Sequence, residues 1–102
     1  MTNQFDSYTI YYQSAPQYYW QSRLYLFENS GHVGTIMFIK ADRPIPANTL
    51  QAGKPVINFP TSSYDEIMAI LRYEKPLFIT LNPANGIGTI STSKEPIGEE
   101  EG

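Results

Sequence analysis

The chain has 102 residues, of which 41% are hydrophobic and 17% charged, the composition of a folded globular domain. It contains no cysteine, so disulfides, cysteine nucleophiles and thiolate metal sites are excluded. The net charge is −3, yet residues 1–94 hold seven basic and six acidic side chains. We therefore predict a single domain over 1–94 and a flexible acidic tail over 95–102. A body so close to neutral disfavours duplex nucleic acid or an anionic membrane as its partner.

The first residues of the chain are polar and lack the apolar segment of a signal peptide. No apolar run approaches the ~20 residues that span a bilayer. We therefore expect a cytoplasmic protein with no membrane partner.

Aromatic and β-branched residues in the first half of the chain favour strands. They predict a strand over 8–13, an interruption at Pro16, and a hairpin whose strands cover 22–28 and 33–41. If Glu28 pairs with Val33, the two faces of this hairpin carry Leu24, Leu26, Thr35 and Met37 on one side, and Arg23, Tyr25, Phe27, Ile36 and Phe38 on the other. Both faces are then rich in apolar side chains. We expect a helix to cover one face, and a loop, a second sheet or a partner subunit to cover the other.

The second half of the chain contains the only convincing helical pattern. Residues 42–54 predict an irregular loop, and the proline-bounded segment 55–60 predicts a short edge strand. Ser63 and Glu66 predict a capping box, which opens a helix over about 63–74 that Pro76 terminates. One face of this helix carries an apolar stripe, formed by Tyr64, Ile67, Met68, Ile70 and Leu71.

A second hairpin follows the helix, with strands over 77–81 and 87–92. Gly86 closes the turn between them, and Gly88 indicates a bulge or a close backbone approach. The whole pattern predicts an α+β domain, in which one helix packs on one face of an antiparallel sheet of five to six strands.

No spacing in the sequence indicates catalysis or metal binding. His32 is the only histidine, and no carboxylate and nucleophile accompany it, so we interpret it as a residue of the first hairpin turn. Gly86-Ile87-Gly88 lacks the third glycine and the following helix that a phosphate-binding loop needs. The run Glu99–Glu101 is typical of a solvent-facing tail. We predict no cofactor and no metal, and we favour a protein without enzymatic activity.

The feature with most functional content is a group of aromatic and arginine side chains in the first third of the chain. Its members are Tyr11, Tyr12, Tyr18, Tyr19, Trp20, Arg23 and Tyr25. Ordinary packing accounts for some of them, but these residue types are also enriched at protein interfaces and their hot spots. Because one helix cannot cover two apolar faces, we predict a binding domain that forms a homodimer through this aromatic-rich face.

Two other uses of the same residues stay open. Strands followed by a helix resemble the layout of Whirly-type single-strand binders, which implies stacking of unpaired bases on the aromatic rings. The seven basic side chains are balanced by six acids in 1–94, which disfavours this alternative. The rings could instead line a small-molecule pocket, in a binding protein or in an enzyme without a recognisable motif.

Overall fold

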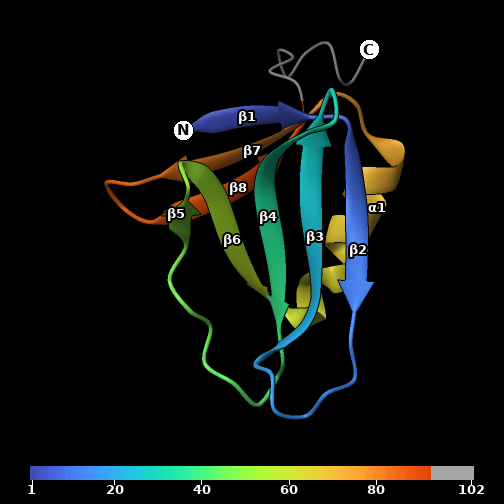
Figure 1. The fold of residues 1–102 in the computed structure, drawn as a ribbon, viewed down its shortest axis with the longest axis vertical. Coiled ribbons are helices and arrows are strands. Elements are labelled where there is room, and N and C mark those ends of the chain that lie inside the picture. The colour runs from blue at the N-terminus through green and yellow to red at the C-terminus, as the bar shows by residue number, and fades with distance from the viewer. Residues whose placement is uncertain (93–102) are drawn as a thin grey trace.

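The structure is a computed structural model that describes residues 1–92. The domain boundary expected at residue 94 and the acidic tail of 95–102 lie outside the described residues. Two β-sheets and one α-helix make up the described part, so the α+β class is confirmed (Figure 1). The elements in chain order are β1 (Thr2–Phe5), β2 (Ser7–Tyr12), β3 (Trp20–Glu28), β4 (Gly31–Ile39), β5 (Thr49–Gln51), β6 (Lys54–Pro60), the 3₁₀ turn η1 (Thr61–Ser63), α1 (Tyr64–Tyr73), β7 (Leu77–Asn82) and β8 (Ile87–Ser91).

The prediction of a single antiparallel sheet is wrong. Five strands form one sheet in the order β2-β3-β4-β6-β5, and three form an antiparallel sheet in the order β1-β7-β8. The larger sheet is mixed, because the chain after β4 returns along the molecule before β6 begins, and β6 therefore pairs with β4 in parallel. The second sheet combines the predicted hairpin of β7 and β8 with β1, a strand that the sequence did not indicate and that pairs with β7.

Both the helix and the smaller sheet lie on the same side of the five-stranded sheet. One continuous core joins the five-stranded sheet to α1 and to the smaller sheet, and its buried members are Phe5, Leu24, Leu26, Ile36, Phe38, Ile57, Ile67, Met68, Leu71, Leu77, Ile79 and Leu81. Figure 1 shows α1 behind the larger sheet, whose other side faces the viewer. Of the three covers expected for that other face, a loop, a second sheet or a partner subunit, the second sheet is ruled out, because the smaller sheet lies on the side of α1. We call this face, opposite α1, the outer face.

The register of the first hairpin also differs from the prediction. Leu24 pairs with Ile36 and Leu26 with Gly34, and an irregularity between Leu26 and Phe27 shifts the pairing near the turn. The turn is tighter than expected, because Asn29 and Ser30 adopt positive φ angles of 51° and 68°. As a result, Leu24, Leu26, Ile36 and Phe38 gather on the core side, while Arg23, Tyr25, Thr35 and Met37 share the outer face.

The helix lies where the sequence predicted it, but the hydrogen bonds predicted at its N-terminus are not formed. Its apolar stripe is confirmed, since Ile67, Met68 and Leu71 are buried against the sheet. The predicted capping box is not formed, because Ser63 already has helical φ and ψ angles within η1 and its side chain makes no cap hydrogen bond. The 3₁₀ turn that precedes α1 takes the place of the cap.

The remaining strands show one confirmed prediction and one correction. Gly88 marks a close approach, as predicted, because a Cβ atom there would lie 2.3 Å from Ile57 Cδ1. The segment 55–60 is not an edge strand, since β5 forms from residues of the expected irregular loop and pairs with its first residues. The short β5 is the edge of the sheet instead.

Candidate interaction surface on the outer sheet face

Five of the predicted site residues come together, and three of their rings lie around the guanidinium group of Arg23. Arg23 Cζ lies 4.6 Å from the ring centroid of Trp20, 5.1 Å from that of Tyr25 and 5.6 Å from that of Tyr11. Tyr18 stacks on Trp20 with ring centroids 6.0 Å apart. We call Tyr11, Tyr18, Trp20, Arg23 and Tyr25 the aromatic cluster.

The strands position this cluster through their alternation and one irregularity. Tyr11 on β2 pairs directly with Arg23 on β3, so both point to the outer face, and the Tyr11 and Tyr25 rings meet edge to face at 5.4 Å. Between Trp20 and Ser22 the pairing with β4 shifts by one residue. Such bulges change the direction in which a side chain points. Here the shift brings Trp20 to the same side as Arg23.

Arg23 is held by aromatic rings and not by an acid. The ion pair found within residues 1–92 joins Arg43 to Asp42, at 4.0 Å, and does not involve Arg23. The Arg23 Nε atom is buried and has no hydrogen-bond partner among the described residues. Cation–π attraction is therefore its main electrostatic stabilisation, worth about 0.5–2 kcal/mol for each well-placed ring.

The row of rings continues beyond the cluster to His32, which the sequence assigned only to a turn. His32 lies in β4, with its ring 5.5 Å from that of Tyr25 and 5.8 Å from that of Phe27. Its Nε2 atom shares a hydrogen bond of 3.1 Å with Thr35 Oγ1. The correct hairpin register, in which Phe27 pairs with His32, is the signal that would have found it.

The other two predicted residues are not members of the cluster, but one of them adjoins it. Tyr19 lines a hollow of about 160 Å³ beside the cluster, together with Arg23, Tyr25, Thr35, Met37, Gln51 and Val56. Tyr12 is on the core side of β2, where its ring meets Tyr64 of α1 edge to face at 5.9 Å. Tyr12 therefore belongs to the helix contact and not to the outer face.

Hydrogen bonds anchor the loop that carries Tyr18. The Lys40 ammonium donates to the carbonyl oxygen of Ala15 at 2.7 Å, and the Arg43 guanidinium donates to that of Pro16 at 3.1 Å. Both donors come from the end of β4 and the turn after it. The loop is thus ordered before any partner binds, which lowers the entropic cost of binding.

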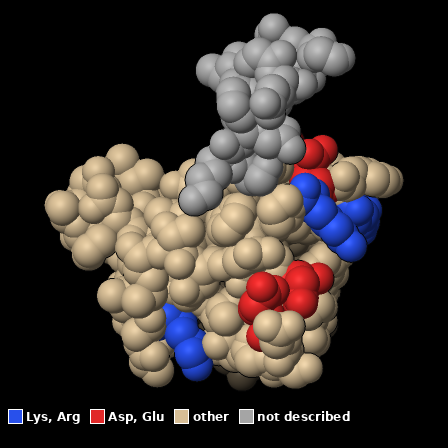
Figure 2. All heavy atoms as spheres, turned by 90° about the horizontal axis from the view of Figure 1, so that it is seen from above, with Lys and Arg blue, Asp and Glu red and all other residues tan. Residues whose placement is uncertain are grey.

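Charge is sparse over the described part of the chain. Residues 1–92 carry six basic and six acidic side chains. Viewed from above, the charged atoms form a few separate groups on a largely uncharged surface (Figure 2). Within residues 1–92, no three histidine or acidic side chains gather as metal ligands do, and the described helix is too short and too polar to cross a membrane.

The sequence found the residue types of this surface but not their arrangement. Aromatic and arginine content marked the group, whereas the two irregularities of β3 decide which members share a face.

Comparison of the chain with protein-family models, with curated proteins and with solved structures gives no match.

Proposed function

We propose that this chain is a non-catalytic interaction domain that forms a homodimer through the outer face of its five-stranded sheet. The observation that carries the proposal is the aromatic cluster on the face opposite α1, in which the rings of Tyr11, Trp20 and Tyr25 surround Arg23 and Tyr18 stacks on Trp20. Aromatic and arginine side chains of this kind are the usual anchors of protein interfaces.

A second copy of the chain suits this face better than a charged partner. Tyr11 and Tyr18 expose 47% and 49% of their surfaces, so their rings are available for burial. A two-fold interface places the same patch on both sides, and a patch of neutral rings does not repel itself. Arg23 does not require an acidic side chain on the partner, because the rings of the two copies can surround both guanidinium groups.

Sedimentation equilibrium at micromolar concentration tests the proposal. We expect a dimer for the native chain, and weaker association for Tyr11→Ser and for Tyr18→Ser, because both variants remove exposed rings of the cluster. Tyr73→Ser is the matched control, since Tyr73 is 80% exposed at the end of α1 and should leave the dimer unchanged. A native chain that stays monomeric at these concentrations would falsify the proposal.

Single-strand nucleic-acid binding is the second candidate, favoured by the stack of Tyr18 on Trp20 next to a cation. Its weakness is the balance of six basic and six acidic side chains in the described residues. If it is correct, oligonucleotides quench Trp20 fluorescence at low salt, and the quenching fades steeply as salt rises. Absence of quenching at low salt excludes it.

A further inference from the structure

A cleft separate from the aromatic cluster opens on the side of the sheet that carries the helix. It measures about 350 Å³ and lies where β1 continues into β2, next to the end of α1 and the start of β7. The residues that line it are Gln4, Phe5, Asp6, Ser7, Tyr8, Leu71, Lys75, Pro76 and Leu77. Ligand pockets in proteins span about 300–1,000 Å³, so this cleft is at the small end of that range.

The floor of the cleft belongs to the core. Phe5, Leu71 and Leu77 line it, and they expose only 2%, 5% and 6% of their surfaces. These side chains are fixed by their core contacts, so the apolar part of the cleft is preformed. A ligand bound there needs an apolar body, because the floor offers few groups for hydrogen bonding.

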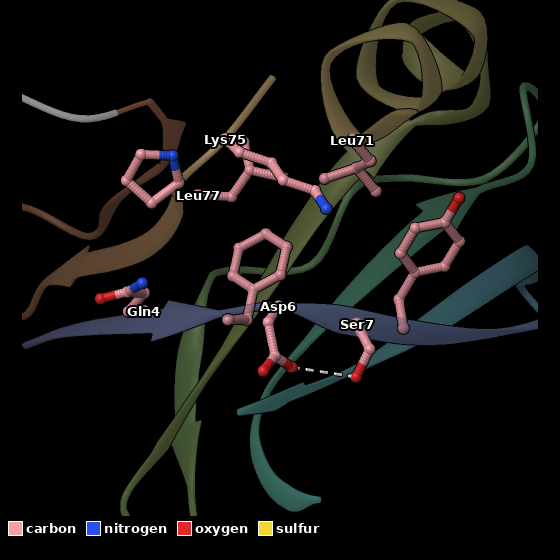
Figure 3. A pocket seen from close by; sticks show the side chains of 9 residues that line it. Gln4, Asp6, Ser7, Leu71, Lys75 and Leu77 are labelled. Carbon is pink, nitrogen blue, oxygen red and sulfur yellow. Dashed lines mark hydrogen bonds between the residues drawn. The ribbon is translucent and has the colours of Figure 1, made fainter. Parts of the chain in front are cut away.

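The rim supplies one cation. In Figure 3 the Lys75 side chain extends toward Leu71, on one side of the strand that carries Asp6 and Ser7. The ion pair present within residues 1–92 is between Arg43 and Asp42, so the Lys75 ammonium has no carboxylate partner there.

Asp6 also lines the cleft, but its carboxylate does not pair with the Lys75 ammonium. Figure 3 shows the Asp6 carboxylate on the opposite side of the strand from Lys75. It accepts a hydrogen bond from the Ser7 hydroxyl at 3.1 Å, and the Asn29 backbone N–H lies 3.5 Å from its other oxygen. The side-chain donors that remain among the described lining residues are thus the Lys75 ammonium, the Gln4 amide and the Tyr8 hydroxyl, and Lys75 alone carries a positive charge.

We propose that this cleft binds a small amphiphilic carboxylate, with the apolar chain on Phe5, Leu71 and Leu77 and the carboxylate at Lys75. At about 30 Å³ for each water-sized group, the cleft holds about ten non-hydrogen atoms, the size of octanoate. The proposal does not depend on the homodimer, because none of the cleft residues belongs to the aromatic cluster.

Amide chemical shifts during a titration with sodium octanoate test this assignment. We expect saturable shifts at Phe5, Tyr8, Leu71 and Leu77 and none at Arg23 or Tyr25. Octan-1-ol has the same chain without the charge, so it should bind at the same residues about three- to tenfold more weakly. Shifts that are absent, that do not saturate, or that appear on the aromatic cluster alone overturn the proposal.

Substitution of Lys75 distinguishes binding of the carboxylate from binding of the apolar chain. Lys75→Gln should weaken octanoate by about three- to tenfold and leave octan-1-ol unchanged, because only the charge is removed. Lys75 is exposed, so this variant should fold, which the dispersion of its amide spectrum verifies. Lys54→Gln removes a lysine at the β5–β6 turn and should change neither ligand. Equal binding of octanoate by the native chain and by Lys75→Gln rules out Lys75 as the carboxylate site.

Discussion

Gly88 lies where the smaller sheet packs against β6, and the Ile57 side chain occupies the space that a Cβ atom would need. A Cβ at residue 88 would stand 2.3 Å from Ile57 Cδ1 and 2.7 Å from Ile57 Cγ2. Ile57 is buried to all but 1% of its surface, so it has little room to turn away. The spacing of the two sheets at this point therefore depends on the absence of a single methyl group.

Gly88→Ala should destabilise the fold by about 1–3 kcal/mol, the usual cost of overpacking a core, as measured by urea unfolding. Gly31→Ala is the control, because a Cβ there meets Glu28 O at an ordinary 3.4 Å. Ile57→Val in the Gly88→Ala background should recover part of the loss, since it removes the Cδ1 atom. Additive effects of the two substitutions would contradict a direct clash.

Glu28 sits beside Asp6, where the chain passes from β1 to β2. One of its carboxylate oxygens, Oε1, is buried without a hydrogen-bond partner among the described residues. Burial first, and the negative charge of Asp6 second, raise the pKa of Glu28 above its ordinary value. The folded state thus holds the Glu28 proton more tightly than the unfolded state does. The stabilisation from this group is complete at low pH and is lost as the pH rises through the raised pKa.

Glu28→Gln should therefore be more stable than the native chain at pH 7. The difference should shrink as the pH falls through the raised pKa of Glu28, and the change should be complete at about pH 4, below the ordinary pKa of a glutamate. Thermal unfolding at a series of pH values measures it. In an Asp6→Asn background the gain from Glu28→Gln should be smaller, because the repulsion is gone. The same gain at pH 4 and pH 7 would show that ionisation of Glu28 is not its cause.

At the scale of elements, β2 is an open edge of the five-stranded sheet. The Gln13 backbone N–H donates to Gln21 O at 3.2 Å, so the odd-numbered residues of β2 bond to β3. The N–H groups of even-numbered residues, Ile10 among them, point away from the sheet. The strand carries no charged side chain that would discourage pairing with another strand.

Proline substitutions along β2 should separate these two directions. Thr9→Pro removes a bond to β3 and should cost about 3 kcal/mol or more, whereas Ile10→Pro should cost about 1 kcal/mol because its N–H is not used. Urea unfolding of the two variants compares them. Equal costs would mean that the ladder between β2 and β3 has the opposite alternation.

The elements also show why part of the fold could be predicted and part could not. The helix followed from local signals, a continuous apolar stripe and a terminating proline, and both are present in the structure. The third strand of the smaller sheet is β1, whose polar residues pair with β7 far along the chain. No local pattern encodes a partner about 75 residues away, and the backbone hydrogen bonds that join the strands leave no mark on side-chain composition.

The aromatic cluster also could be predicted in part only. Its residue types indicated an interface, and five of its seven predicted members do gather. Which face each one occupies depends on irregularities within β3, and a shift of one residue turns a side chain to the other face. It also depends on the alternation along β2, which places Tyr12 on the core side beside Tyr64 of α1.

At the scale of the whole molecule, the two sheets and the helix share one hydrophobic core. Phe5 and Ile79 of the smaller sheet are in the same cluster of buried residues as Leu24 of the larger sheet and Met68 of α1. The chain also joins the two sheets directly, since β1 of the smaller sheet runs through Asp6 into β2 of the larger sheet. Neither sheet can keep its buried face covered if the other unfolds.

The described part should therefore unfold in a single cooperative transition. Trp20 fluorescence reports on the larger sheet, and far-ultraviolet circular dichroism reports on all elements, so the two should give the same midpoint. Only folded chains form the proposed dimer. The midpoint should therefore rise with protein concentration, while the two probes remain coincident. Separate midpoints would contradict the shared core, whereas coincident midpoints that do not change with concentration would support the core and contradict the dimer.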